Sequence, residues 1–393
     1  MLRYKVLRSL KNYFLTGKMV DAKIKDFGYN LCRKYLGGEW KKISPQHFEI
    51  ERIHGGLTNH LFLCSLPQEY ANSNPDGVNK ALLRLYGAFY ADLSDNNVRM
   101  MEECIICGLL AEKKMAPELY GIFPEGRLEQ FIPNVRALTS REVQYPHLSQ
   151  QIAEHVAAFH KLKLPLSKEG TWFLDSLQIF VKEIKGLKFS NVDKLKILDE
   201  IFHKFDIDEI LKFIRHVVEN SQSPVFFCHN DVQPGNLLVK ANEDLDEAKI
   251  RVIDFEYSCY NYRGYDISNH FSEWIFDYNH PHYPFFTGDV TKYPSYDQKV
   301  FFVRAYLQAY NEATDVTLDE IEKVIDEADR LSLLSHFFWA MFSTLQSYKS
   351  SINFGYLEYA LFRMECLNHF RHFSEEKPGD KFRHDNGKIH CDV

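Results

Sequence analysis

Two short polar stretches in the second half of the chain constrain its fold more than any other feature. Residues 227–238 read FCHNDVQPGNLL, and residues 252–257 read VIDFEY. Each sets carboxylates or an amide beside a short apolar run that is typical of a strand. Polar side chains in apolar surroundings need partners or a chemical role. We therefore expect two short paired strands to carry Asp231, Asn236 and Asp254 on loops that face one cleft.

The rest of the chain divides into a strand-rich part and a helix-rich part. A length of 393 residues exceeds the usual single core and predicts two lobes. Strands are expected on both sides of the Gly-Gly turn in 48–66 and in 80–87, 118–123 and 126–133, with a polar hairpin tip at 72–79 and a helix from Asn96 to Lys114. Helices are expected in 142–162, 184–220 and 317–373, with only two short strands, 236–239 and 250–255.

This pattern predicts an α+β fold with a small β-rich N-terminal lobe and a larger, mainly helical C-terminal lobe. The expected parts are an extension (1–20), an N-terminal lobe (21–131), a C-terminal lobe (132–374) and a polar tail (375–393).

Charge and composition narrow the class of partner. A net charge of -7 disfavours nucleic acid and anionic membranes, and suits a small cationic substrate. No apolar run has membrane-spanning length, so we expect no stable membrane insertion. Cys104 and Cys107 form the single C-x-x-C pattern, inside a helical segment without a second pair, which favours buried thiols over zinc or redox chemistry. These features together predict a reduced, cytoplasmic compartment.

The two polar stretches have a chemical interpretation and a structural one. Phosphoryl transfer needs a residue that accepts the proton of the attacking hydroxyl, and oxygen ligands for magnesium. Asp231 would serve as the base, and Asn236 and Asp254 would hold the metal. In the structural alternative, Asp231 and Asn236 satisfy turn backbone and Asp254 caps a strand. Either stretch alone leaves both interpretations open, whereas their combination at this spacing favours phosphoryl transfer.

The stretch HNDVQPGN resembles the catalytic loop H-x-D-x-x-x-x-N of the protein-kinase superfamily, and IDFEY stands where protein kinases carry D-F-G. Glu256 replaces that glycine, which points to the small-molecule phosphotransferases of the same fold. FCHNDVQPGNLL, VIDFEYSCYNYRGYDISNHFSEW and YGIFPEGRLEQFIP closely resemble stretches of the choline/ethanolamine kinase family, in order from about Phe27 to Phe370.

The resemblance implies ATP and Mg2+ as cofactors and a set of nucleotide-binding residues. It implies a phosphate-covering loop whose glycines let the backbone approach the triphosphate. It also implies a phosphate-binding arginine, Arg84, whose ion-pair partner would be Glu103, with Glu102 as the alternative. The nucleotide-binding set is Gly55, Gly56, Leu57, Thr58, Asn59, Arg84, Glu103, Gln130, Ile132 and Gln233.

The same resemblance implies a choline pocket in the second lobe. A quaternary ammonium group has no N–H, so a protein recognises it through charge and aromatic ring faces. The implied residues are Asp231, Tyr257, Glu273, Tyr278, Trp339, Phe342 and Tyr356. Choline kinases usually carry Trp at the position of Phe342, so we expect weaker choline binding or a shifted preference.

The implied activity is ATP-dependent phosphorylation of choline to phosphocholine, the first step of phosphatidylcholine synthesis by the CDP-choline route. Two alternatives stay open: an ethanolamine-preferring kinase of the same family, and a catalytically silent scaffold relative. The resemblance also implies a possible homodimer.

Overall fold

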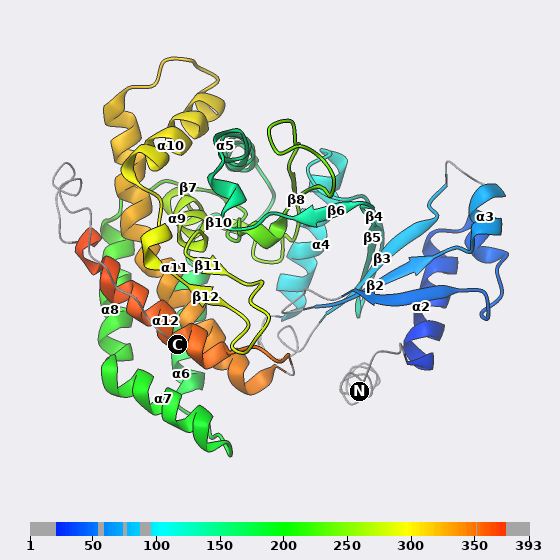
Figure 1. The fold of residues 1–393 in the computed structure, drawn as a ribbon, viewed down its shortest axis with the longest axis horizontal. Coiled ribbons are helices and arrows are strands. Elements are labelled where there is room, and N and C mark those ends of the chain that lie inside the picture. Colours follow the sequence, from blue (N-terminus) through cyan, green and yellow to red (C-terminus); the bar gives the residue numbers. More distant parts are fainter. Residues whose placement is uncertain (1–20, 54–58, 74–76, 87–95, 351, 375–393) are drawn as a thin grey trace. The chain divides into compact units, whose positions relative to one another are not determined.

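The computed structural model describes residues 21–53, 59–73, 77–86, 96–350 and 352–374 (Figure 1). The chain forms two compact units, one ending at Asn134 and one beginning at Val135. The sequence places this boundary slightly earlier, between residues 131 and 132. Across the described residues, no helix is both long enough and apolar enough to cross a membrane.

The first unit is built on a five-stranded antiparallel sheet with strand order β1–β2–β3–β5–β4. Its strands are β1 (Glu49–Ile53), β2 (His60–Ser65), β3 (Lys80–Leu85), β4 (Leu119–Phe123) and β5 (Gly126–Gln130). The strands predicted in this part are confirmed. β5 runs so close to β3 that a Cβ on Gly126 would lie 1.9 Å from the backbone oxygen of Arg84, which explains the glycine.

The helices of the first unit are α2 (Ala22–Tyr35), the 3-10 turn η1 (Gly38–Lys41), α3 (Gln68–Ser73) and α4 (Asn96–Glu112). The helix predicted from Asn96 is confirmed as α4. The prediction of a hairpin tip at 72–79 is wrong at its start, because α3 continues to Ser73. The oxygen of Pro67 accepts the N–H groups of Tyr70 and Ala71, both at 3.0 Å, and so closes the first turn of α3.

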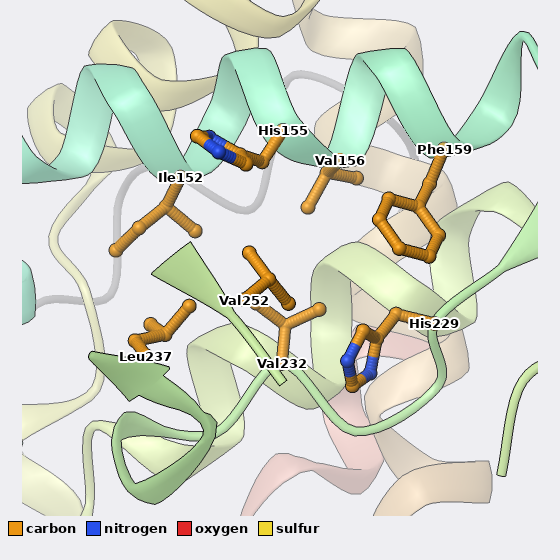
Figure 2. Close-up of a pocket in the computed structure, with 8 residues that line it drawn as sticks. All are labelled: Ile152, His155, Val156, Phe159, His229, Val232, Leu237 and Val252. Atoms are coloured by element: carbon orange, nitrogen blue, oxygen red, sulfur yellow. The ribbon is translucent and has the colours of Figure 1, made fainter. Parts of the chain in front are cut away.

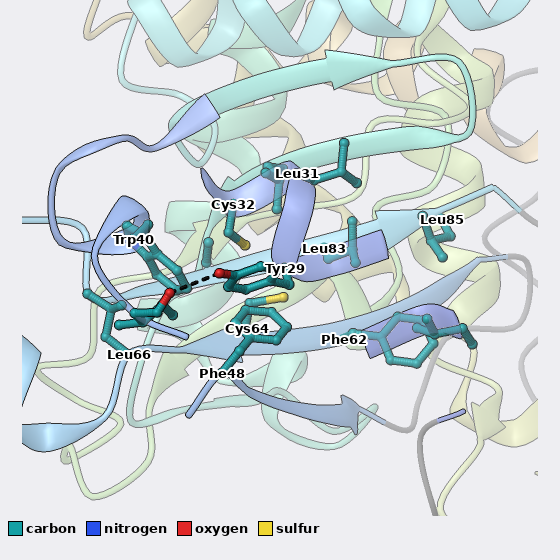
Figure 3. Packing of buried hydrophobic residues seen from close by; sticks show 14 of the residues in the cluster. Tyr29, Leu31, Cys32, Trp40, Phe48, Phe62, Cys64, Leu66, Leu83 and Leu85 are labelled. Atoms are coloured by element: carbon teal, nitrogen blue, oxygen red, sulfur yellow. Dashed lines mark hydrogen bonds between the residues drawn. The ribbon is translucent and has the colours of Figure 1, made fainter. Parts of the chain in front are cut away.

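The core of the first unit lies between α2 and the sheet, as Figure 3 shows. A Cβ on Gly28 of α2 would lie 3.2 Å from Ile50 Cδ1 and 3.3 Å from Leu83 Cδ2, so this small residue lets the helix approach the strands closely. Tyr29 donates its hydroxyl hydrogen to the Ile43 oxygen at 2.9 Å. The buried phenol group is therefore hydrogen-bonded, as a polar atom in an apolar core requires.

The second unit is mainly helical. Its helices are α5 (Pro146–His160), α6 (Trp172–Ile184), α7 (Val192–Lys204), α8 (Ile207–Asn220), α9 (Arg263–Glu273), α10 (Tyr296–Asn311), α11 (Leu318–Lys349) and α12 (Tyr356–His369). Figure 1 shows α11 as the long helix against which α9 and α12 pack. α11 begins at a capping box, in which Thr317 and Glu320 each accept the other's backbone N–H. The helices predicted in 142–162, 184–220 and 317–373 are confirmed, whereas α6, α9 and α10 were not anticipated.

Short strands and 3-10 turns complete the second unit. The strands form three small sheets: β6 (Val135–Ala137) with β8 (Leu237–Lys240) and β9 (Arg251–Val252); β7 (Val225–Cys228) with β10 (Cys259–Tyr262); and β11 (Phe276–Asp277) with β12 (Thr287–Gly288). The 3-10 turns are η3 (Glu142–Gln144), η4 (Pro234–Asn236), η5 (Val290–Lys292) and η6 (Phe370–Ser374). The prediction of only two strands here is wrong, because strands of two to four residues are too short to show an alternating pattern. The predicted pair itself is confirmed as β8 and β9.

Candidate functional site

The loop between β7 and β8 brings two predicted site residues into direct contact. Asn236 Nδ2 donates hydrogen bonds to the backbone oxygen and to Oδ2 of Asp231, both at 2.9 Å. The turn η4 makes this contact possible, and the side chain of Gln233 caps that turn by accepting the Gly235 N–H at 3.3 Å. The amide thus fixes the orientation of the Asp231 carboxylate.

A buried carboxylate on α9 anchors the start of this loop. Asp266 is fully buried and accepts the backbone N–H groups of His229 at 3.0 Å and Asn230 at 2.7 Å. It also accepts a hydrogen bond from His160 Nε2 at 3.1 Å. Burial raises the pKa of Asp266, but the His160 contact and the other hydrogen bonds outweigh burial, so its net pKa is lowered. Asp266 therefore holds the backbone next to Asp231 with an ionised side chain.

Asn230 adopts a left-handed backbone conformation, with φ of 68°. Asparagine tolerates this region better than most residues, and its side chain is fully engaged here. Its Nδ2 donates to the Tyr257 oxygen at 2.9 Å, and its Oδ1 accepts from Asn261 Nδ2 at 2.8 Å. These bonds join the Asp231 loop to the segment that follows Asp254.

Two buried histidines support the loop as neutral rings. His229 Nδ1 accepts the Asp231 N–H at 3.2 Å, so its hydrogen is on Nε2 and is donated to the Ile253 oxygen at 3.1 Å. His270 bonds the Val232 oxygen through Nδ1 at 2.9 Å and accepts from Trp274 through Nε2 at 3.2 Å. Burial lowers the pKa of both imidazoles, that of His270 to about 4.

A narrow apolar pocket separates this loop from α5 (Figure 2). Side chains from α5 face side chains from the loop and from β8 and β9. The lining residues are Ile152, His155, Val156, Phe159, His229, Val232, Leu237 and Val252. The pocket belongs to the packing under the loop, which rests on α5 through apolar contacts.

The charge around Asp231 is strongly negative. Burial, followed by the charges of Glu273, Asp254 and Glu256, raises the pKa of Asp231 well above its usual value, while the Asn236 hydrogen bond opposes this shift. Among the described residues, none donates a hydrogen bond to Asn236 Oδ1. An amide oxygen and nearby carboxylates are ligands that Mg2+ prefers. The residues present therefore fit a magnesium ion held by Asn236 and Asp254.

Three aromatic rings form a cluster that begins with Tyr257, in the segment that follows Asp254. Tyr257 lies 5.1 Å from Trp339 and 6.2 Å from Phe342, and the latter two are 5.4 Å apart, all between ring centroids. Their interplanar angles are 76° to 87°, so ring faces and edges alternate. Asn269 of α9 holds Trp339 by accepting its indole N–H at 2.7 Å. The resemblance implied that these rings belong to one pocket, and the structure brings them together.

Glu273 and Tyr278 also lie together, within a wider buried network. Tyr278 donates its hydroxyl hydrogen to Glu273 Oε2 at 2.8 Å, and Arg363 Nη2 donates to Glu273 Oε1. Tyr359 joins both partners, at 3.0 Å from the Tyr278 hydroxyl and 2.6 Å from Arg363 Nη2. Tyr356, which the sequence singled out, instead has its hydroxyl 3.1 Å from that of Ser350.

In the first unit, the predicted arginine has a different partner from the one expected. Arg84 Nε donates to Glu129 Oε1 at 3.2 Å, whereas Glu103 pairs with Arg127. Arg127 Nε in turn donates to Glu129 Oε2 at 2.7 Å. The expectation of a direct Arg84–Glu103 pair is thus wrong, because Arg127 and Glu129 on β5 lie between them. Glu102 pairs with Arg99 at 3.5 Å instead.

The remaining predicted residues are placed as follows. Asn59 is buried just before β2. Gln130 ends β5, with its Oε1 accepting the Glu118 N–H at 3.3 Å, and Ile132 is half-buried two residues later. The loop residues Gly55, Gly56, Leu57 and Thr58 lie outside the described residues. Cys107 is buried and Cys104 half-buried, both as free thiols.

Four functional neighbours were missed by sequence reasoning: Asp266, Asn230, Tyr359 and Arg363. Asp266 carries one usable signal, because it lies in a stretch, RGYDISNHFSE, that forms a helix buried from Gly264 to Glu273. A carboxylate on such a helix needs internal partners. Tyr359 and Arg363 follow Tyr356 at helical spacing, which alone does not distinguish a site from a core.

Comparisons with known proteins bear on the family and on the fold. A family model described as choline/ethanolamine kinase matches residues 50–368. Choline kinase alpha of Mus musculus is 39% identical over 373 residues, which cover 90% of this chain and 82% of that protein. A choline/ethanolamine kinase of Homo sapiens is 38% identical over 341 residues, covering 86% and 84% of the two chains. The crystal structure of choline kinase from Cryptosporidium parvum Iowa II matches with a TM-score of 0.66 at 26% identity, covering 89% of this chain and 95% of that one. The predicted fold class is therefore confirmed.

Proposed function

The chain belongs to the choline/ethanolamine kinase family, and from that premise we propose that it transfers the γ-phosphoryl group of ATP to the hydroxyl of choline. The products are phosphocholine and ADP. The observation that carries the choice of substrate is the aromatic cluster of Tyr257, Trp339 and Phe342 in the same unit as the acidic group around Asp231. Ring faces and negative charge suit a quaternary ammonium alcohol.

Asp231 is the proposed base. Its raised pKa makes the carboxylate a better proton acceptor than an ordinary aspartate, and the Asn236 hydrogen bond holds it in one orientation. The hydroxyl of choline loses its proton to Asp231 as its oxygen attacks the γ-phosphorus and ADP leaves. Positioning supplies most of the acceleration in such a transfer.

Asn236 and Asp254 are the proposed magnesium ligands, on the strength of their oxygen atoms and the surrounding negative charge. The metal, when bound, neutralises charge on the transferred phosphoryl group. In the first unit, Arg84 is the proposed phosphate ligand, and the chain Glu129–Arg127–Glu103 orients its guanidinium. The loop from Gly55 to Asn59 and the positions Gln130, Ile132 and Gln233 stay predictions for nucleotide binding.

The test of the base is Asp231→Asn. We expect kcat for choline to fall by about a thousandfold or more, with nucleotide binding nearly unchanged, since the amide cannot accept the proton. Asp289→Asn is the control, because Asp289 caps η5 and has no proposed role in transfer. General acid–base catalysis contributes about a hundredfold or more to the rate. An Asp231→Asn variant that turns over at about a tenth or more of the control rate would therefore contradict the assignment of the base.

Two further comparisons separate the alternatives. The ratio of kcat/KM for choline and ethanolamine distinguishes a choline kinase from an ethanolamine-preferring one. Formation of phosphocholine from ATP by the purified protein eliminates a silent scaffold. The cytoplasmic compartment and the homodimer stay predictions, to be checked by fractionation and by light scattering.

A further inference from the structure

The carboxylate of Glu273 is already paired inside the protein. The residue is 3% exposed, and both of its carboxylate oxygens accept hydrogen bonds, Oε1 from Arg363 and Oε2 from Tyr278. Arg363 is fully buried on α12, and its guanidinium lies 4.0 Å from the ring centroid of Phe276. The Glu273 side chain is thus neutralised by a cation that cannot leave for solvent.

The hydrogen atoms of this network have one consistent arrangement. The single hydroxyl hydrogen of Tyr278 is donated to Glu273, so Tyr278 must accept in its 3.0 Å contact with Tyr359. Tyr359 is free to donate there, because it accepts twice from Arg363, at 2.8 Å from Nε and 2.6 Å from Nη2. Burial, and then the charge of Glu273, raise the pKa of Tyr278 well above its usual value, so its hydroxyl keeps this hydrogen. The four side chains form a closed ring of donors and acceptors.

The hydrogen-bonded network of Glu273, Tyr278, Tyr359 and Arg363 lies beside the aromatic cluster and the proposed base. Asn269, which holds Trp339, precedes Glu273 by one turn of α9. The charge of Glu273 also acts on Asp231. A substrate bound between the aromatic cluster and Asp231 therefore meets a Glu273 carboxylate that is already paired with Arg363.

We propose that Arg363 is a positioning residue that sets the preference for quaternary over primary ammonium alcohols by occupying and neutralising Glu273. The inference rests on the proposed function. An unpaired Glu273 would accept charge-assisted hydrogen bonds from the N–H groups of ethanolamine, whereas choline has none to donate. With Glu273 engaged by Arg363 and Tyr278, this advantage of ethanolamine is removed, and ring faces decide recognition.

The test is the ratio of kcat/KM for ethanolamine to that for choline, in the Arg363→Met and Arg363→Lys variants. We expect Arg363→Met to raise this ratio by roughly tenfold, the effect of one charged hydrogen bond of ordinary strength, mainly through KM. N-methylethanolamine and N,N-dimethylethanolamine should gain in order of their N–H groups. Arg363→Lys keeps the charge and should move the ratio by less than about threefold.

Arg263→Met is the matched control, because Arg263 forms a partly buried pair with Glu327 at 2.6 Å at the other end of α9. It should lower stability and leave the ratio within about twofold of the unsubstituted protein. A folded Arg363→Met variant whose ratio also stays within about twofold overturns the proposal.

Tyr278→Phe decides the question if Arg363→Met does not fold. This substitution keeps the ring and releases Glu273 Oε2, so the ratio should rise by roughly threefold or more. Its control is Tyr283→Phe, which removes an exposed hydroxyl bonded to Glu358. An unchanged ratio in Tyr278→Phe refutes the proposal. If the unsubstituted protein phosphorylates neither alcohol, the proposed function itself has failed, whereas turnover with unmoved ratios refutes the role of Arg363 alone.

Discussion

Replacement of Asp266 by Asn should damage both stability and catalysis, although Asp266 touches neither substrate in the proposed reaction. The carboxylate accepts three hydrogen bonds, from the N–H groups of His229 and Asn230 and from His160 Nε2. An amide offers one accepting oxygen, and its NH2 group would face a donor. At least one of the three bonds is therefore lost and replaced by a repulsive contact.

The magnitude follows from burial. Hydrogen bonds to a charged group contribute about 1.5–3 kcal/mol each, and a buried donor left without a partner costs about 1–3 kcal/mol. Asp266→Asn should therefore lower the free energy of unfolding by about 3 kcal/mol or more. Because the loop next to Asp231 loses its anchor, kcat should fall by roughly a hundredfold.

The assay combines urea unfolding with steady-state kinetics, and the control is Asp329→Asn. Asp329 is also buried and accepts from Lys299 Nζ at 2.6 Å, but it lies on α11 and not on the helix that holds the loop. Both variants should lose stability, and Asp266→Asn alone should lose kcat beyond its loss of folded protein. If Asp266→Asn unfolds within about 0.5 kcal/mol of the unsubstituted chain, the reasoning from its three bonds is refuted.

Three further outcomes are expected. Asp254→Ala should lose about a hundredfold or more in kcat and require more magnesium, and an unchanged magnesium titration would exclude it as a ligand. Phe342→Trp should lower KM for choline about two- to fivefold through a larger ring face, and a higher KM would show that the ring is held for packing. Burial raises the pKa of Glu129, but Arg127 and Arg84 outweigh it and set the pKa at about 2, below the ordinary 4.5. The contribution of ionised Glu129 to the free energy of unfolding should be complete above pH 4.5 and should be lost as pH falls toward 2. Glu129→Gln should make the free energy of unfolding depend less on pH in this range, and an equal pH dependence in the two proteins would contradict the ion pair.

Local patterns predicted the elements that carry chemistry well. Asp231 and Asn236 were predicted on one loop, and the strands β8 and β9 beside it were found where the apolar runs stand. These features depend on neighbours within a few residues. The first sheet was predictable for the same reason, because its strands are short apolar runs separated by polar segments that contain glycine.

Long-range partners could not be predicted in this way. Arg84 was assigned to Glu103 because the family resemblance implied an ion pair between these two positions. The pairing of β3 with β5 instead places Glu129 closer to Arg84. Arg363 is separated from Glu273 by 90 residues, and no local signal links them. Which of several charges meet in a core depends on packing between elements, and helical or strand periodicity carries no information about it.

Helix α9 sets the distance between the loop of the proposed base and the proposed cation-binding site. Asp266 holds the loop of the proposed base, and Glu273, seven positions later on the same helix, belongs to the proposed cation-binding site. A rise of about 1.5 Å per residue separates the two by roughly 10 Å along the axis. Since α9 is buried along its length from Gly264 to Glu273, this distance cannot stretch without moving the helix itself. In the proposed reaction, the backbone of α9 therefore fixes the length of alcohol that fits, whereas the side chains select its head group.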